Sequence, residues 1–220
     1  MSVKILISGF EPIWGIKKTP SGELAKLWQR TDLPLPEGVE TRSIILPQRY
    51  GVCTEMLCDQ IKAFQPNVIL MFGATMKNDP LRFERFAINA ESSVMGDDSK
   101  VLIKDRPIVI GGPSAYESTL PISYLVDKLM ESGTHARASF HGGTHVCNSL
   151  MYGVLHYLST NPLDHKVAAG FMHVSFPNSF GVVEDDLWGT AEWPDLVRAS
   201  FTIVREVSAY FFGTEEKSEV

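Results

Sequence analysis

The run Val68-Ile69-Leu70-Met71-Phe72 decides the fold class, because an uninterrupted apolar strand is typical of a sheet covered on both faces. Similar short apolar runs alternate along the chain with stretches whose apolar residues recur at helical spacing. Strands are expected at 3–7, 42–46, 68–72, 82–90, 136–140 and 167–174, and helices from about 19, at 52–64, 122–132, 149–158 and 195–211. This order predicts an α/β fold, with helices on both faces of a largely parallel sheet.

Length and composition indicate one globular domain over 1–212, followed by a polar, acidic, frayed tail over 213–220. The net charge of −6 comes from 26 acidic and 20 basic residues without a basic cluster, so neither nucleic acid nor a membrane is an expected partner. No apolar run approaches the roughly 20 residues of a membrane span, and no signal peptide is recognised. Three cysteines, an odd number, favour a reducing cytoplasm.

Cys147 is the first candidate for chemistry. It follows Gly142-Gly143 and precedes the amphipathic stretch 149–158, so it is expected at or near a helix N-terminus. The unpaired N–H groups and the helix dipole there favour a thiolate, the reactive form of cysteine. The alternative is a small buried apolar residue. Cys53 and Cys58 are interpreted as core or surface thiols without a role.

Glu84 is the second candidate. On an extended strand it would share a face with Phe86 and Ile88, where a carboxylate is costly unless it is paired. It could orient a catalytic base, or it could form a structural ion pair with Arg82 or Arg85.

His173 lies near the end of an apolar strand, where catalytic groups of open α/β sheets gather, although a hydrogen-bonded core histidine is the alternative. His141, His145 and Cys147 raise the possibility of zinc. However, Gly142-Gly143 lies between His141 and His145 and disfavours a continuous helix that would bring the two rings together. No CxxC or HExxH pattern accompanies them, so no metal is expected. The loop at 9–15 has neither GxGxxG nor a P-loop lysine, so a phosphate site is a weak reading.

Five segments together resemble one family, in family order and at family spacing: Gly9-Phe10-Glu11-Pro12, Glu84-Arg85-Phe86-Ala87-Ile88-Asn89, Gly111 to Ile122, Gly143-Thr144-His145-Val146-Cys147-Asn148 and Gly170-Phe171-Met172-His173-Val174. The chain resembles the pyroglutamyl peptidase I, or pyrrolidone-carboxylate peptidase, family of cysteine peptidases over nearly all its length. The resemblance implies a Glu84–Cys147–His173 triad and a three-layer α/β/α sandwich related to the nucleoside phosphorylase fold. It also implies no cofactor, a cytoplasmic homotetramer, and removal of N-terminal pyroglutamyl residues from peptides.

The resemblance places substrate against a further set of residues: Phe10, Ile13, Trp14, Ala74, His145 and Val146. Several positions depart from the family pattern. Ile13 replaces a phenylalanine, His145 an aromatic residue, Gln48 a threonine, and Val94 stands near a usual arginine. The segment Gly73-Ala74-Thr75-Met76-Lys77-Asn78 also replaces one that usually carries glycines and an arginine. Phe10 can still stack on a flat lactam.

Three hypotheses follow. The first is a cofactor-free cysteine exopeptidase that removes pyroglutamyl residues through a thioester intermediate. The second keeps the triad but acts on another N-terminally blocked peptide, or on a small lactam or amide, because the pocket residues differ. The third is a scaffold that binds a ligand or partner without turnover.

Overall fold

A computed structural model describes residues 2–13, 15–75, 81–180 and 192–213. In these residues the main sheet has six strands, in the order β2-β1-β3-β8-β4-β7. Their bounds are β1 Val3–Phe10, β2 Val39–Leu46, β3 Val68–Thr75, β4 Leu81–Glu84, β7 Ala136–Ser139 and β8 Ala168–Ser175. The neighbours among β2, β1, β3 and β8 are parallel, whereas β4 runs antiparallel to β8 and parallel to β7. The sheet is therefore mixed and mostly parallel.

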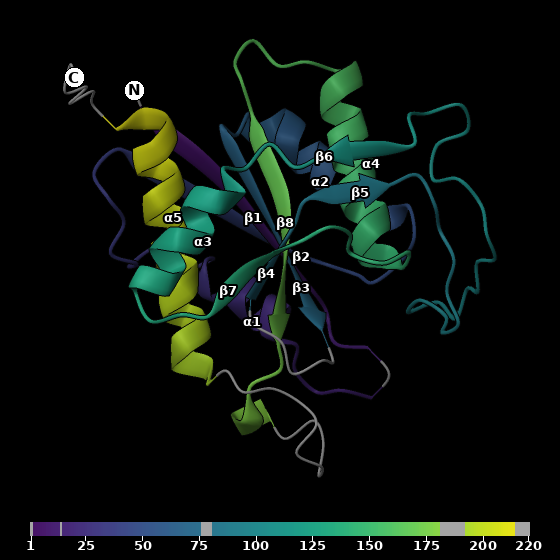
Figure 1. Ribbon diagram of the computed structural model, residues 1–220, viewed down its shortest axis with the longest axis horizontal. Coiled ribbons are helices and arrows are strands. Elements are labelled where there is room, and N and C mark those ends of the chain that lie inside the picture. Colours follow the sequence, from purple (N-terminus) through teal and green to yellow (C-terminus); the bar gives the residue numbers. More distant parts are fainter. Residues whose placement is uncertain (1, 14, 76–80, 181–191, 214–220) are drawn as a thin grey trace.

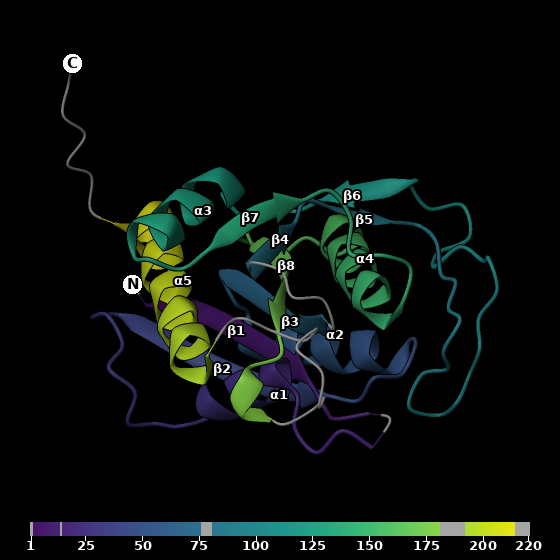
Figure 2. The same ribbon diagram turned by 60° about the horizontal axis from the view of Figure 1, so that its bottom comes forward.

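Helices cover both faces of this sheet (Figures 1 and 2). Their bounds are α1 Pro20–Leu27, α2 Val52–Phe64, α3 Ile122–Glu131, α4 Val146–Thr160 and α5 Trp193–Phe212, with a short 3-10 turn at Asn178–Phe180. Helices α3 and α5 lie on one side of the sheet and α2 and α4 on the other, while α1 contacts α5. A small second sheet of β5 (Phe86–Ile88) and β6 (Ala115–Glu117) packs against α4.

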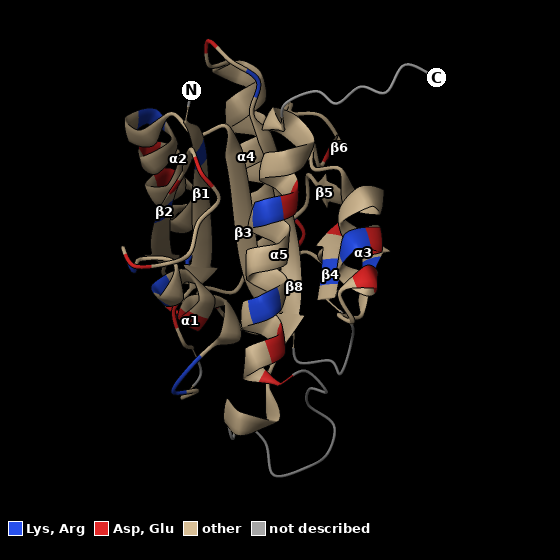
Figure 3. Ribbon diagram, turned by 90° about the vertical axis from the view of Figure 1, so that its left-hand side faces the viewer, with Lys and Arg blue, Asp and Glu red and all other residues tan. Residues whose placement is uncertain are grey.

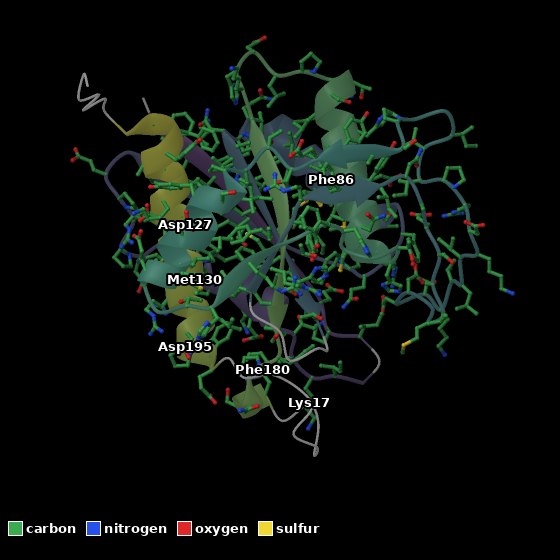
Figure 4. All side chains as sticks on the ribbon, viewed as in Figure 1. Lys17, Phe86, Asp127, Met130, Phe180 and Asp195 are labelled. Carbon is green, nitrogen blue, oxygen red and sulfur yellow. The ribbon has the colours of Figure 1, made fainter. Side chains whose placement is uncertain are left out.

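Each face of the sheet has its own apolar core. Under α1, α3 and α5, Trp28 and Leu125 are fully buried against the sheet. Under α2 and α4, Leu57, Leu150 and Phe171 are equally buried. Figure 4 shows side chains on both sides, with Phe86 on the α4 side and Asp127, Met130 and Asp195 on the side of α3 and α5. The predicted three-layer α/β/α arrangement is confirmed.

The expected helix ends are also confirmed. The Thr19 hydroxyl accepts a hydrogen bond from Gly22 N at 3.1 Å, and Pro20 occupies the first helical turn of α1. Helix α3 ends at Glu131, and Gly133 follows with a φ of +80°, the left-handed conformation that glycine adopts readily.

One expected strand, 82–90, is divided between the two sheets. β4 ends at Glu84, and β5 starts at Phe86 in the second sheet. Between them, Arg85 N donates to Ser139 O at 2.6 Å and Arg85 O accepts from Ser118 N at 2.8 Å. The prediction that Glu84, Phe86 and Ile88 share one strand face is therefore wrong, because the chain changes sheets at Arg85.

The other predicted strands and helices lie where the sequence predicts them, with ends that differ by a few residues. β1 continues to Phe10, β2 begins at Val39 and β3 continues to Thr75. Most of the predicted tail, 214–220, lies outside the described residues. Of the helices in the described part of the chain, none has both the length and the apolar character of a membrane span.

Candidate active site

His173 and Glu84 form a buried hydrogen-bonded pair across the antiparallel strands β8 and β4. Nδ1 of His173 lies 2.7 Å from Oε1 of Glu84, and the two side chains are 6% and 0% exposed. An ionised carboxylate only accepts hydrogen bonds, so Nδ1 carries the proton, and Nε2 is the ring nitrogen that can act as a base.

Burial would by itself raise the pKa of the Glu84 carboxyl. The hydrogen bond and charge of His173, followed by the Ser139 hydroxyl and the Arg82 guanidinium, outweigh burial and hold that pKa below its usual value. Glu84 is therefore a carboxylate at neutral pH, able to orient the imidazole and to stabilise its protonated form.

Both predicted ion-pair partners of Glu84 can be placed. Arg82 Nε lies 3.6 Å from the same Oε1 atom that binds His173, so Glu84 contacts a cation as well as the imidazole. Arg85 instead pairs with Glu117 at 3.0 Å. The structural and the catalytic interpretations of Glu84 therefore coexist.

Cys147 is the second residue of α4, directly after the loop that follows β7. Gly143 has a φ of +85°, and His145 precedes the helix in an extended conformation without capping it through its side chain. The first bond of the helix joins Ser149 N to His145 O at 3.1 Å. The N–H groups of 146–148 thus have no acceptor within the helix, and they lie around the thiol-bearing residue.

The absence of a side chain at Gly73 makes room for the Cys147 thiol. Gly73 on β3 is the register partner of His173 on β8. A Cβ atom at Gly73 would lie 3.1 Å from Cys147 Sγ and 2.6 Å from the Phe171 ring. Because Gly73 and His173 are neighbours on the sheet, the thiol is brought over the strand pair that carries the imidazole.

Cys147 and His173 open into one cavity of about 390 Å³. Four of the predicted substrate-binding residues line it: Phe10, Ile13, Ala74 and His145. Gln48 and Val94, noted as departures from the family pattern, line it too. Val146 is fully buried in the core beneath α4, so only its backbone could meet a substrate. Trp14 and the segment 76–78 lie outside the described residues.

The ionisation of Cys147 differs from the prediction. Burial, and to a smaller extent the neighbouring Cys53 and Glu84, raise the pKa of the Cys147 thiol to about 12. The backbone hydrogen bond at Cys147 acts in the opposite direction but is the smaller effect, so the direction of the shift contradicts the expected resting thiolate. Cys147 is a neutral thiol that must pass its proton to a nearby base before it can attack.

His145 and His141 have local partners. His145 Nε2 lies 3.3 Å from Met95 O, and burial lowers the pKa of this imidazole, which is neutral at physiological pH. His141 Nδ1 accepts from Gly143 N at 3.2 Å. In the part of the chain that the structure describes, no three His, Cys, Asp or Glu residues group in a way that could hold a metal ion.

Sequence reasoning missed the part that Asn148 plays in holding the site together, and it named Arg82 as a possible partner of Glu84 without placing it in the cavity. Asn148 is buried and clamps α4 to β5: its Oδ1 accepts from Ile88 N at 2.9 Å, and its Nδ2 donates to Ile88 O at 2.9 Å and Ala90 O at 3.0 Å. Its position beside Cys147 was the available signal. Arg82 lines the cavity, and its position two residues before Glu84, on the same strand face, could have indicated this.

Comparison with known proteins shows the family of the chain. A sequence profile of the pyroglutamyl peptidase family matches residues 3–191. A pyrrolidone-carboxylate peptidase of Erwinia tasmaniensis is 36% identical over 174 residues, which cover 79% of this chain and 78% of that protein. One of Yersinia pestis is 36% identical over 173 residues, covering 79% and 78%.

Solved structures agree as well. The A199P mutant of the pyrrolidone carboxyl peptidase of Pyrococcus furiosus matches with a TM-score of 0.86 and 28% identity, covering 96% of this chain and 100% of that chain. The E192D mutant of the same enzyme gives a TM-score of 0.85, covering 94% and 99%. The chain belongs to the pyroglutamyl peptidase family of cysteine peptidases.

Proposed function

We propose that this protein removes an N-terminal pyroglutamyl residue from peptides, with Cys147 as nucleophile, His173 as general base and acid, and Glu84 as the group that orients His173. The observation that carries the proposal is the 2.7 Å contact between His173 Nδ1 and Glu84 Oε1 beside a cavity that Cys147 shares.

The steps follow from the protonation states of the site. His173 Nε2 takes the proton of the Cys147 thiol as Sγ attacks the carbonyl that joins the lactam residue to the next amino acid. Sγ–C bond formation pushes electrons onto the carbonyl oxygen, and N–H groups at the start of α4 are placed to stabilise this oxyanion. His173 then protonates the leaving amine, which leaves a thioester. Water, deprotonated by His173, hydrolyses the thioester and restores the thiol.

The lining of the cavity suits an uncharged lactam. Phe10, Ile13 and Ala74 offer apolar surface, while Gln48 and His145 offer polar atoms. Pyroglutamate has a flat ring and lacks the ammonium group of an ordinary N-terminus, so apolar walls with few hydrogen-bonding groups favour it over a free amino acid.

By analogy with the family, we also propose that the enzyme works in the cytoplasm, without a cofactor, as a homo-oligomer, with a tetramer as the expected form.

The test is hydrolysis of pyroglutamyl-aminomethylcoumarin under reducing, metal-free conditions by the wild type, Cys147→Ala and the control Cys53→Ala. The proposal expects release by the wild type and the control, and none by Cys147→Ala. Wild-type enzyme that leaves this substrate intact but cleaves another blocked aminoacyl-coumarin would overturn the pyroglutamyl assignment while retaining the triad. Full activity of Cys147→Ala would overturn the mechanism.

A further inference from the structure

The summed charge of Glu84, Cys147 and His173 points to a role for a fourth residue, Arg82. Attack requires a thiolate at Cys147 and an imidazolium at His173, above the buried carboxylate of Glu84. Those three groups together carry a charge of minus one in a place where an unbalanced charge is costly. Among the described residues that line the cavity, Arg82 is the one lysine or arginine. With its positive charge the reacting arrangement is neutral.

The position of Arg82 suits that role. It is the register partner of His173 across β4 and β8, and it shares a strand face with Glu84. Its Nε lies 3.6 Å from Glu84 Oε1, the atom bound by His173, and its side chain is 15% exposed. Figure 3 shows basic colouring on β4. A cation so close and so little exposed to water is weakly screened, unlike a surface pair.

The other charged or titratable groups nearby do not replace it. Arg137, its register partner on β7, is exposed. His145, on the loop before α4, is neutral because burial lowers its pKa. Cys53, on α2, has its pKa raised to about 12 by burial and supplies no positive charge. The Arg82 charge opposes both the effect of burial on Glu84 and the effect of burial on the Cys147 thiol.

We propose that Arg82 is a positioning residue that keeps Glu84 ionised and neutralises the site when the Cys147 thiolate and His173 imidazolium form. This inference rests on the proposed function, since it assigns Arg82 a part in the same reaction. Arg82 acts through Glu84 and the charge balance, without a bond to the reacting carbonyl.

The test compares Arg82→Gln, Arg82→Met and Arg82→Lys with the wild type. Arg82→Met keeps the aliphatic stem, so a neutral variant remains if Arg82→Gln does not fold. Arg82→Lys keeps the charge. The matched control is Arg85→Gln, which removes the same charge one residue after Glu84 but breaks the outward pair with Glu117. Thermal unfolding of every variant establishes that it is folded.

The first readout is the rate at which iodoacetamide alkylates Cys147 as a function of pH, followed by peptide mass spectrometry. It needs no substrate, so it remains informative if pyroglutamyl hydrolysis fails. Loss of Arg82 should raise the pH needed for alkylation by about one unit, equal to roughly tenfold slower labelling at fixed pH. Arg82→Lys and Arg85→Gln should stay within about threefold of the wild type.

The second readout is the acid limb of the kcat/KM profile. Without Arg82, Glu84 takes up its proton at higher pH, so the limb should move upward by about one pH unit in the neutral variants. A purely structural residue would lower Tm and scale activity equally at every pH. Neutral variants that are folded and retain both wild-type pH profiles would overturn the proposal, as would an equal shift in Arg85→Gln.

Discussion

The lack of a side chain at Gly73, close to Cys147 and Phe171, gives the most direct test of the site geometry. In Gly73→Ala the new Cβ would lie 2.6 Å from the Phe171 ring and 3.1 Å from Cys147 Sγ. Contact at about 3.4 Å is ordinary, so the ring must retreat by roughly 0.8 Å and the sulfur by roughly 0.3 Å. Phe171 packs against the His173 ring with centroids 4.9 Å apart, so the imidazole is displaced too.

The size of the effect follows from these shifts. Forcing a methyl group into this close-packed site should cost about 2 kcal/mol of unfolding free energy, which lowers Tm by roughly 4–8 °C. Displacement of the nucleophile and its base by up to about 1 Å should lower kcat/KM by about 10²-fold.

The assay pairs thermal unfolding with hydrolysis of pyroglutamyl-aminomethylcoumarin. Gly153→Ala is the matched control, because its Cβ would meet Thr54 Cγ2 at 2.6 Å, an equally close contact, between α4 and α2. Gly153→Ala should lose as much stability as Gly73→Ala, or less, and should keep wild-type activity. If Gly73→Ala is folded and retains kcat/KM within about threefold of the wild type, the thiol does not occupy the space assigned to it here.

Three further predictions concern neighbouring groups. Glu84→Gln should lower kcat/KM by about 10²–10⁴-fold. The wild type should be more stable than this variant at neutral pH, and the difference should shrink as pH falls below about 4.3, because a carboxylate with a depressed pKa stabilises the fold only while it is ionised. Measurement of Tm between pH 3 and 7 checks this. His173→Ala should slow iodoacetamide labelling of Cys147 at pH 7 at least about tenfold, since a thiol of pKa about 12 needs a base; equal labelling would refute this. Asn148→Ala should cost about 2–4 kcal/mol in denaturant melts by leaving the partly buried backbone groups of Ile88 and Ala90 unpaired, whereas exposed Asn161→Ala should be nearly neutral.

Local patterns in the sequence predict most of the fold. The apolar run of β3 and the cap at Thr19 depend on residues close together in the chain, and the structure confirms both. The break at Arg85 was not predicted. The alternation of polar and apolar residues is interrupted at Glu84-Arg85, but this local pattern does not show that the chain changes sheets there. The break is fixed by hydrogen bonds to Ser118 and Ser139, far along the sequence. The antiparallel direction of β4 is equally a product of long-range pairing.

In the candidate site too, some features could be predicted from local sequence and others depend on the folded structure. Glu84, Cys147 and His173 were recognisable from motifs, and the structure brings Glu84 into contact with His173. The ionisation of Cys147 was not predictable, because it depends on how the folded chain packs around the partly buried thiol, and burial raises its pKa. A helix N-terminus can be read from a local pattern, but desolvation cannot.

The clamp between Asn148 and β5 also determines how the site can come apart. β5 follows β4 after a single residue, so the helix carrying the thiol and the strand carrying its carboxylate are tied to one short piece of backbone. Neither can detach by local unfolding without pulling on the other. The nucleophile and its acid therefore belong to one cooperative unit, and a fluctuation that opens one should dismantle both.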